Sequence, residues 1–119
     1  MVLVDTSIWI NFLRKSDNQL PFLLTNGEVV THEFIIGELA CGNIKNRQEF
    51  FGLFSTLPRV KTCLSDEIIY FIENNNLYEK GIGYIDMNLL ASALVSNVKL
   101  WTIDKKLKDT ATYFNINFL

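Results

Sequence analysis

The chain has 119 residues, of which 49% are hydrophobic and 20% are charged. This length corresponds to one domain, residues 1–119, and the composition supports a packed core and argues against disorder. Acidic and basic side chains number 13 and 11, and the net charge of −2 disfavours a protein that binds nucleic acid through a broad basic surface. Asp, Asn or Gly interrupts the apolar stretches, and no basic segment or cleavage site opens the chain. We therefore expect no membrane span, no secretory signal and a cytoplasmic location.

Short β-branched runs predict buried strands, and apolar residues at helical spacing predict helices. In chain order, the pattern predicts a strand at 2–4, helices at 6–13 and 20–24, a strand at 28–31, helices at 33–41 and 46–57, an edge strand at 60–62, helices at 65–79 and 84–95, a strand at 100–103, a helix at 104–112 and a strand at 116–118. This alternation indicates a parallel sheet with helices on both faces. Ligands bind such sheets beyond the carboxyl ends of the strands.

Cysteine and histidine content excludes several kinds of site. Cys41 and Cys63 are far apart and form no CxxC pair, so we expect two reduced thiols in the core or half-buried. The single histidine, His32, excludes any site that needs two histidines. Ile36 stands where a zinc protease would have its second histidine.

Two carboxylates directly follow predicted strands. Asp5 comes after the strand at 2–4, and Asp104 comes after the strand at 100–103. Each position is also typical of a helix N-cap, and for either residue taken alone we favour that structural role. Together they mark the edge of the sheet where a ligand is expected.

Two further acids share a predicted helix stripe with apolar residues. Glu38 lies three residues from Ile35, and Asp86 lies three and four residues before Leu89 and Leu90. Both are therefore expected to face inward, although Asp86 in a first helical turn also suits the helix dipole. Buried carboxylates without cations cost several kcal/mol, so a bound divalent metal is the simplest solution.

Oxygen ligands suit Mg²⁺ or Mn²⁺. Thr6 and Ser7 follow Asp5 directly, so we expect their hydroxyl groups to orient the Asp5 carboxylate or a bound water. Such a metal favours phosphoryl chemistry. Competing phosphate sites fail on sequence, because no Walker A loop is present and Gly81-Ile-Gly83 lacks the third glycine of a dinucleotide fingerprint. A haloacid-dehalogenase-type phosphatase needs an aspartate where Ser7 stands.

Four segments, in order, resemble the successive motifs of PIN-domain ribonucleases, and most closely the VapC toxins of type II toxin–antitoxin pairs. They are Val4-Asp-Thr-Ser-Ile-Trp9, Phe34-Ile-Ile-Gly-Glu-Leu-Ala-Cys-Gly42, Gly83-Tyr-Ile-Asp-Met-Asn-Leu-Leu-Ala91 and Trp101-Thr-Ile-Asp104. The resemblance covers essentially the whole chain. It implies a single-domain α/β fold, a three-layer α/β/α sandwich with a mainly parallel sheet of four to five strands.

The resemblance also implies an activity: cleavage of RNA phosphodiesters by a metal-activated water, with Mg²⁺ or Mn²⁺ as cofactor. Carried over by motif, the catalytic and metal-binding residues are Asp5, Glu38, Asp86 and Asp104, with Thr6 and Ser7 in support. Asp5 and Asp86 are the principal ligands, and Asp104 is either a fourth ligand or only a helix cap. The implied partners are RNA, a second copy in a homodimer, and a small VapB-like antitoxin that blocks the site.

RNA phosphates require local positive charge. The candidates are Lys105 and Lys106, which adjoin Asp104, together with Arg14, Lys15, Lys45, Arg47 and Lys108. Solvated helix ends are the alternative interpretation for each. A dimer or antitoxin face is offered by two groups of apolar side chains, although core packing is the favoured role for any one of them: Phe50, Phe51 and Phe54, and Ile68, Ile69, Phe71 and Ile72.

Two other functions remain open. The first is a non-catalytic RNA- or protein-binding module on the same fold, and the cost of keeping acids on apolar stripes argues against it. The second is a metal-dependent phosphatase of small molecules, which the serine at position 7 disfavours.

Overall fold

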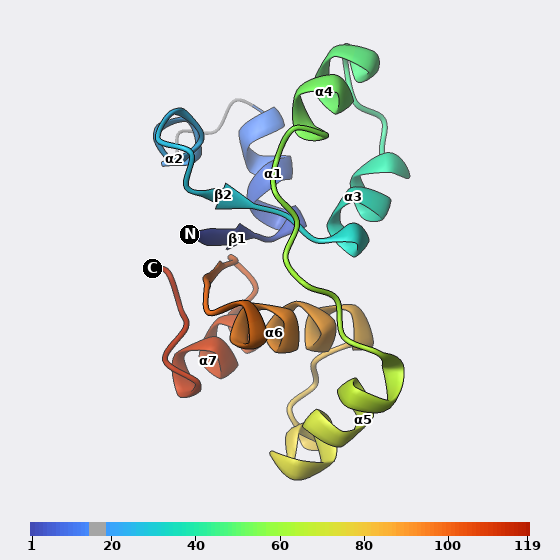
Figure 1. Ribbon diagram of the computed structural model, residues 1–119, viewed down its shortest axis with the longest axis vertical. Coiled ribbons are helices and arrows are strands. Elements are labelled where there is room, and N and C mark those ends of the chain that lie inside the picture. The colour runs from blue at the N-terminus through green and yellow to red at the C-terminus, as the bar shows by residue number, and fades with distance from the viewer. Residues whose placement is uncertain (15–18) are drawn as a thin grey trace.

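The computed structural model describes residues 1–14 and 19–119. Figure 1 shows the elements. In chain order they are β1 (Val2–Val4), α1 (Thr6–Leu13), α2 (Leu20–Thr25), β2 (Val29–Val30), α3 (Glu33–Ala40), α4 (Arg47–Phe54), α5 (Ser65–Asn74), the 3₁₀ helix η1 (Leu77–Glu79), α6 (Tyr84–Ser96), β3 (Lys99–Trp101) and α7 (Lys105–Tyr113).

The sheet is parallel, with β1 at its centre and β2 and β3 on either side. Val2 pairs with Val29 on one side and with Lys99 on the other, and Val4 pairs with Trp101. Figure 1 shows α1 to α4 on one side of the strands and α5 to α7 on the other, so the layers are α/β/α. The predicted fold class, an α/β protein with a parallel sheet covered on both faces, is confirmed.

The sheet has fewer strands than the four to five expected. In the described part of the chain the outer positions hold single bridges, between Thr31 and Arg59 and between Leu100 and Asn117. At the first edge only Val60 is buried among residues 58–62, so little apolar surface fixes a longer strand there. Pro58 also has no N–H with which to extend the ladder.

Asparagine residues set helix boundaries that periodicity did not predict. Asn76 adopts a left-handed conformation (φ 54°) and divides the predicted helix at 65–79 into α5 and η1. Asn46 (φ 52°) delays the start of α4, and Asn97 (φ 55°) ends α6. Asparagine tolerates this region better than most residues, because its short side chain bonds locally.

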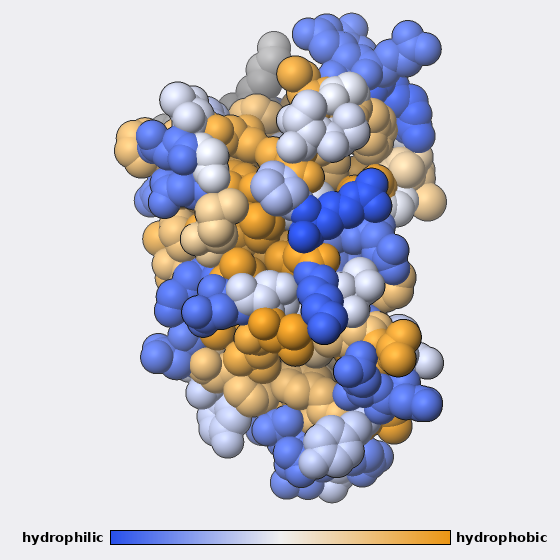
Figure 2. Space-filling model, in the orientation of Figure 1, coloured by the Kyte–Doolittle hydropathy of each residue, from blue (hydrophilic) through white to orange (hydrophobic). Residues whose placement is uncertain are grey.

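The core is densest around α6. Every residue from Met87 to Ala93 is buried, as expected for a helix enclosed on all sides. Strand β3 packs on this helix from the sheet, and α5, with its buried Ile68, packs on it as well. On the face shown in Figure 2, apolar side chains gather across the middle of the molecule, over the sheet and α6. The buried α6 carries Asp86 at its exposed end, which fixes the position of that side chain.

Within residues 1–14 and 19–119, no helix is both long and apolar enough to cross a membrane.

Candidate active site

Asp5 lies at the carboxyl end of the central strand and is only 7% exposed. Its Oδ1 accepts a hydrogen bond from the backbone N–H of Thr6 (2.8 Å), which caps α1. Its Oδ2 accepts from the hydroxyl groups of Ser7 (2.9 Å) and Thr102 (2.7 Å). The cap expected for Asp5 is present, and the same carboxylate is held in one orientation by three neutral donors.

Thr102 is a residue of this site that the sequence analysis did not identify. It is buried, donates to Asp5 Oδ2, and accepts a bond from the backbone N–H of Asp104 (3.1 Å). Its hydroxyl therefore joins the ends of β1 and β3. The register of the strands would have identified it, because Val4 pairs with Trp101 and the next residues, Asp5 and Thr102, therefore lie side by side.

Asp104 follows β3 and is exposed. Its Oδ1 accepts from the backbone N–H of Leu107 (3.0 Å) and caps α7. The structural role favoured for this residue is therefore present. Its second carboxylate oxygen has no hydrogen-bond donor within the described residues, so the cap leaves that oxygen open to a ligand.

Glu38 differs from the expectation that it faces the core, because its side chain is exposed. Ile35 and Leu39 form the centre of the buried stripe of α3, and Glu38 lies at its edge together with half-buried Phe34. The Glu38 Oε1 accepts a bond from the Thr6 hydroxyl (2.7 Å). Thr6 thus links α3 to the residue that follows Asp5, and this brings Glu38 to the same edge of the sheet.

Asp86, in the first turn of α6, is half-buried. The pKa of this carboxyl is raised from 3.8 to about 6, most of all by burial and in addition by the negative charges of Asp5, Asp104 and Glu38. In the part of the chain that the structure describes, no hydrogen-bond donor reaches the Asp86 side chain. The four predicted acids therefore share one electrostatic site, and Asp86 is the member that the other three repel.

The donor set fits a hard divalent cation. Among residues 1–14 and 19–119, the one ion pair joins Lys105 to Asp109, so none of the four acids is neutralised by a basic side chain. All four offer carboxylate oxygens, the ligands preferred by Mg²⁺ and Mn²⁺. No group of three or more His, Cys, Asp or Glu in these residues lies close enough to hold a metal as positioned. A cation held by three or more of these acids would therefore require their side chains to rearrange.

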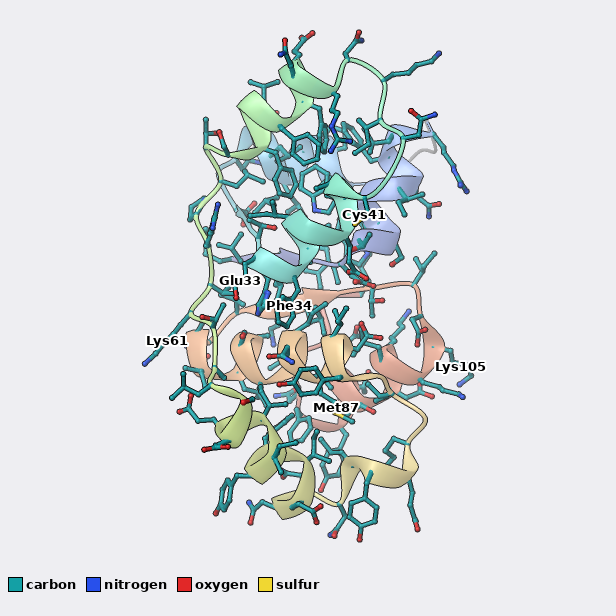
Figure 3. All side chains as sticks on the ribbon, turned by 90° about the vertical axis from the view of Figure 1, so that its right-hand side faces the viewer. Glu33, Phe34, Cys41, Lys61, Met87 and Lys105 are labelled. Carbon is teal, nitrogen blue, oxygen red and sulfur yellow. The ribbon has the colours of Figure 1, made fainter. Side chains whose placement is uncertain are left out.

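Two of the predicted RNA-contacting residues, Lys105 and Arg47, form interactions with other residues of the chain. Lys105 pairs with Asp109 at 3.0 Å, and Figure 3 shows it on the side of the molecule opposite Lys61. Arg47 donates to the carbonyl oxygens of Ala40 and Gly42 and lies over the Phe51 ring, so it closes the end of α3.

Other predicted cations border cavities. Arg14 and Lys45 line a cavity that also contains Glu38, and Lys106 lines a second one beside α7. Lys108 is exposed on α7, and Lys15 lies outside the described residues.

Cysteine and histidine take no part in this arrangement. Cys63 is half-buried as expected, whereas Cys41 is exposed at the end of α3, and both thiols are free. His32 is buried, and its Nδ1 accepts from the backbone N–H of Phe34 (2.9 Å) to cap α3. Burial lowers the pKa of His32, while the charge of Glu33 opposes that change, so His32 serves as a neutral cap.

The sequence matches the PIN-domain family over residues 2–113. The chain therefore belongs to the PIN-domain family. Its relatives include "Ribonuclease VapC32" from two Mycobacterium tuberculosis strains, CDC 1551 / Oshkosh and ATCC 25618 / H37Rv. Each is 42% identical over 109 residues, which is 91% of this chain and 88% of the relative. The predicted resemblance to VapC-type PIN ribonucleases is confirmed.

A solved structure supports the fold independently. The crystal structure of PAE2754 from Pyrobaculum aerophilum is similar with a TM-score of 0.63 and 17% sequence identity. The match covers 91% of this chain and 77% of that chain. At this identity the likeness concerns the fold alone, and it agrees with the α/β/α layers described above.

Proposed function

We propose that this chain, a single PIN-like domain over residues 1–119, is an endoribonuclease that acts as the toxin of a toxin–antitoxin pair and hydrolyses RNA phosphodiesters. The observation that carries the proposal is the placement of Asp5, Glu38, Asp86 and Asp104 at one edge of the sheet, where hydroxyl groups link the segments that carry three of them and no described basic side chain pairs with any of the four acids. Such a cluster is costly unless a cation binds it. The match to proteins named ribonucleases supports the same conclusion.

Asp5 and Asp86 would hold the cation chiefly, with help from Glu38 and Asp104. Mg²⁺ or Mn²⁺ fits this set because every donor is an oxygen. A cation bound here would offset phosphate charge, lower the pKa of a water molecule and let a polyanion approach an acidic site.

The remaining residues position these carboxylates. Thr102 and Ser7 hold Asp5 Oδ2, and the Thr6 hydroxyl holds Glu38 Oε1. Because Thr102 also binds the N–H of Asp104, a shift of β3 relative to β1 would displace two of the acids together. These hydroxyl groups therefore act as supporting residues rather than as ligands.

The acidic site also defines the chemistry of an inhibitor. A VapB-like antitoxin would block the site by placing a basic side chain, such as arginine, among carboxylates that otherwise need a cation. We further propose that the toxin is a homodimer and that RNA and antitoxin compete for the same edge of the sheet.

The test is cleavage of single-stranded RNA by the purified chain with Mg²⁺, with Mn²⁺, and with a chelator. We expect cleavage that requires a cation and is lost in Asp86→Asn. Asp66→Asn is the matched control, because Asp66 is an exposed first-turn acid of α5, away from the site. Cation-independent cleavage, or equal activity of Asp86→Asn, would refute the proposal.

The same assay separates the competing functions. RNA binding without cleavage would favour a binding module, and hydrolysis of a monophosphate ester in preference to RNA would favour a small-molecule phosphatase.

A further inference from the structure

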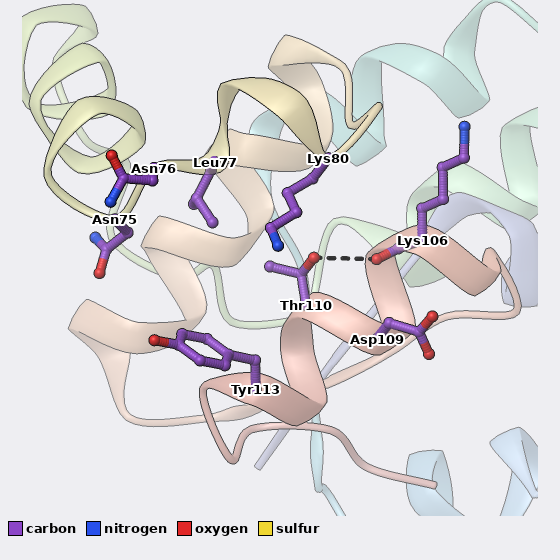
Figure 4. A pocket seen from close by; sticks show the side chains of 8 residues that line it. All are labelled: Asn75, Asn76, Leu77, Lys80, Lys106, Asp109, Thr110 and Tyr113. Carbon is purple, nitrogen blue, oxygen red and sulfur yellow. Dashed lines mark hydrogen bonds between the residues drawn. The ribbon is translucent and has the colours of Figure 1, made fainter.

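We propose that the cavity between η1 and α7 is a nucleotide-binding subsite, which holds the RNA strand on one side of the cleaved bond. The inference rests on the proposed ribonuclease function and extends it to a second site. The cavity has a volume of about 410 Å³, within the range of small-molecule sites. Figure 4 shows its lining, which consists of Asn75, Asn76, Leu77, Lys80, Lys106, Asp109, Thr110 and Tyr113.

The cavity adjoins the carboxylates through Lys106. This residue lies in the first turn of α7, two residues after Asp104. Its Nζ packs against the loop that leads to α6, since a Cβ added at Gly81 would lie 2.8 Å from that nitrogen. Gly81 has φ +72°, so both conformation and space favour glycine there. The Lys106 ammonium thus lies against the loop that precedes Asp86, and Figure 4 shows its side chain directed away from Thr110 and Tyr113.

Charge in the cavity suits a phosphate. Lys80 and Lys106 have no carboxylate partner among the described residues, whereas Asp109 is paired with Lys105. Two cations with one compensated acid leave a local positive excess next to an acidic site. An RNA strand that runs from the carboxylates into the cavity would meet these ammonium groups with its phosphates, as electrostatic binding of nucleic acid requires.

Aromatic and amide groups suit a base. Tyr113 is 78% exposed, and its ring is steadied edge-to-face by Phe114, with centroids 5.1 Å apart. Exposed aromatic rings are the common platforms for stacking of single-stranded bases. The Asn75 amide nitrogen is fixed by the Phe71 carbonyl (2.9 Å), and Asn76 adds a second amide for the edge of a base.

The cavity walls are held in place by local bonds. Figure 4 shows the Lys80 side chain directed toward Thr110, whose hydroxyl donates to the Lys106 carbonyl oxygen at 3.1 Å. A free phosphate would use the lysines and leave the tyrosine without a role. A nucleotide uses the cations, the ring and the amides together, so the lining favours RNA.

The experiment measures KM and kcat for Mn²⁺-dependent cleavage of a mixed-sequence single-stranded RNA of about 20 nucleotides. Tyr113→Leu should raise KM by about 5- to 10-fold, with a smaller effect on kcat, because loss of one stacked base weakens binding while the carboxylates stay intact. Tyr113→Phe should recover most of the affinity. Lys80→Gln should raise KM and lower the slope of log affinity against log salt by about one.

Matched controls separate the cavity from general surface effects. Tyr70→Leu removes a tyrosine that is 69% exposed on α5, outside the cavity. Lys61→Gln removes an exposed lysine on the side of the molecule opposite Lys105. Both controls should retain the KM of the original chain.

The outcomes distinguish the subsite from the proposed function. Cleavage with KM unchanged in Tyr113→Leu and Lys80→Gln overturns the subsite and leaves the ribonuclease proposal standing, with a protein partner as the remaining occupant. If the chain does not cleave RNA, the ribonuclease proposal fails, and fluorescence anisotropy with the same RNA decides the subsite. Weaker binding by the two cavity variants than by the controls supports it, whereas equal or absent binding overturns it.

Discussion

Asp5 and Asp86 are both aspartates of one acidic site, but their surroundings are opposite. Asp5 accepts three hydrogen bonds, from the N–H of Thr6 and the hydroxyl groups of Ser7 and Thr102. Asp86 has no donor among the described residues, and burial together with three neighbouring carboxylates raises its pKa to about 6. Hydrogen bonds stabilise the ionised form of Asp5, whereas the surroundings of Asp86 destabilise its ionised form.

Because of this difference, we expect Asp5 to contribute to the stability of the fold, whereas Asp86 lowers that stability and contributes to function. Hydrogen bonds to an ionised carboxylate stabilise its charge, so Asp5 supports the folded chain even without a metal. Asp86 opposes folding when it is ionised, and a cation bound at the proposed site would reverse that effect. The same substitution at the two positions should therefore change stability in opposite directions while abolishing the same activity.

Asp86→Asn should produce the largest change, a loss of RNA cleavage of at least about 100-fold, more than is typical for a supporting residue. Without metal, the variant should be more stable than the original chain by roughly 1–2 kcal/mol at about pH 7.5, because removal of the repelled charge outweighs the lost interaction with the dipole of α6. Chemical denaturation in a chelator measures the second effect. A less stable variant would contradict this account of Asp86.

Asp5→Asn should lose activity to a similar extent. Its stability should fall by about 1–2 kcal/mol, because the amide NH₂ that replaces Oδ2 cannot accept the hydrogen bonds that Ser7 and Thr102 donate to it. The substitution spares the helix cap, since asparagine caps as well as aspartate. Equal gains in stability for Asp5→Asn and Asp86→Asn would show that the two environments do not differ.

Thr102→Val tests the hydroxyl that supports Asp5. We expect cleavage to fall by roughly 10- to 100-fold, as for residues that orient metal ligands. Stability should decrease by about 1–2 kcal/mol, since buried Asp5 Oδ2 and the N–H of Asp104 each lose a partner. Thr112→Val is the matched control, because that exposed hydroxyl bonds only to the Lys108 carbonyl within α7. Equal activity of the two variants would remove Thr102 from the site.

The pH dependence of stability gives the smallest effect. A pKa raised from 3.8 to about 6 means that the folded chain favours protonated Asp86, so stability from this group is full below about pH 4 and is lost as pH rises through 6. The metal-free Asp86→Asn variant should match the original chain at low pH and exceed it above pH 6. His32 changes stability in the opposite direction because burial lowers its pKa, but it is present in both chains. A constant difference across this range would contradict the raised pKa.

Sequence reasoning predicted the features that local pattern determines. The strand Val2–Val4 and the helices from Thr6, Glu33 and Tyr84 begin where periodicity placed them. The division of residues 65–79 depends on the left-handed conformation of Asn76, which apolar spacing does not report. The predicted strand at 60–62 shortens to a bridge between Thr31 and Arg59, because Val60 alone among residues 58–62 is buried.

The site shows the same limit. The order of motifs identified four acids that the structure brings to one edge of the sheet. The prediction that Glu38 faces the core was wrong, because helical offsets do not distinguish the centre of an apolar stripe from its edge. Thr102 was missed, because its role depends on the register that places it beside Asp5.

The most direct test is calorimetric titration of Mn²⁺ into the metal-free chain and into Asp5→Asn, Asp86→Asn and Asp66→Asn. We expect the original chain and Asp66→Asn to bind the cation at one site with similar affinity. We expect Asp5→Asn and Asp86→Asn both to lose this binding, although Asp5→Asn is less stable than the original chain and Asp86→Asn is more stable. Cation binding of equal affinity in all four proteins would show that these carboxylates do not form a metal site.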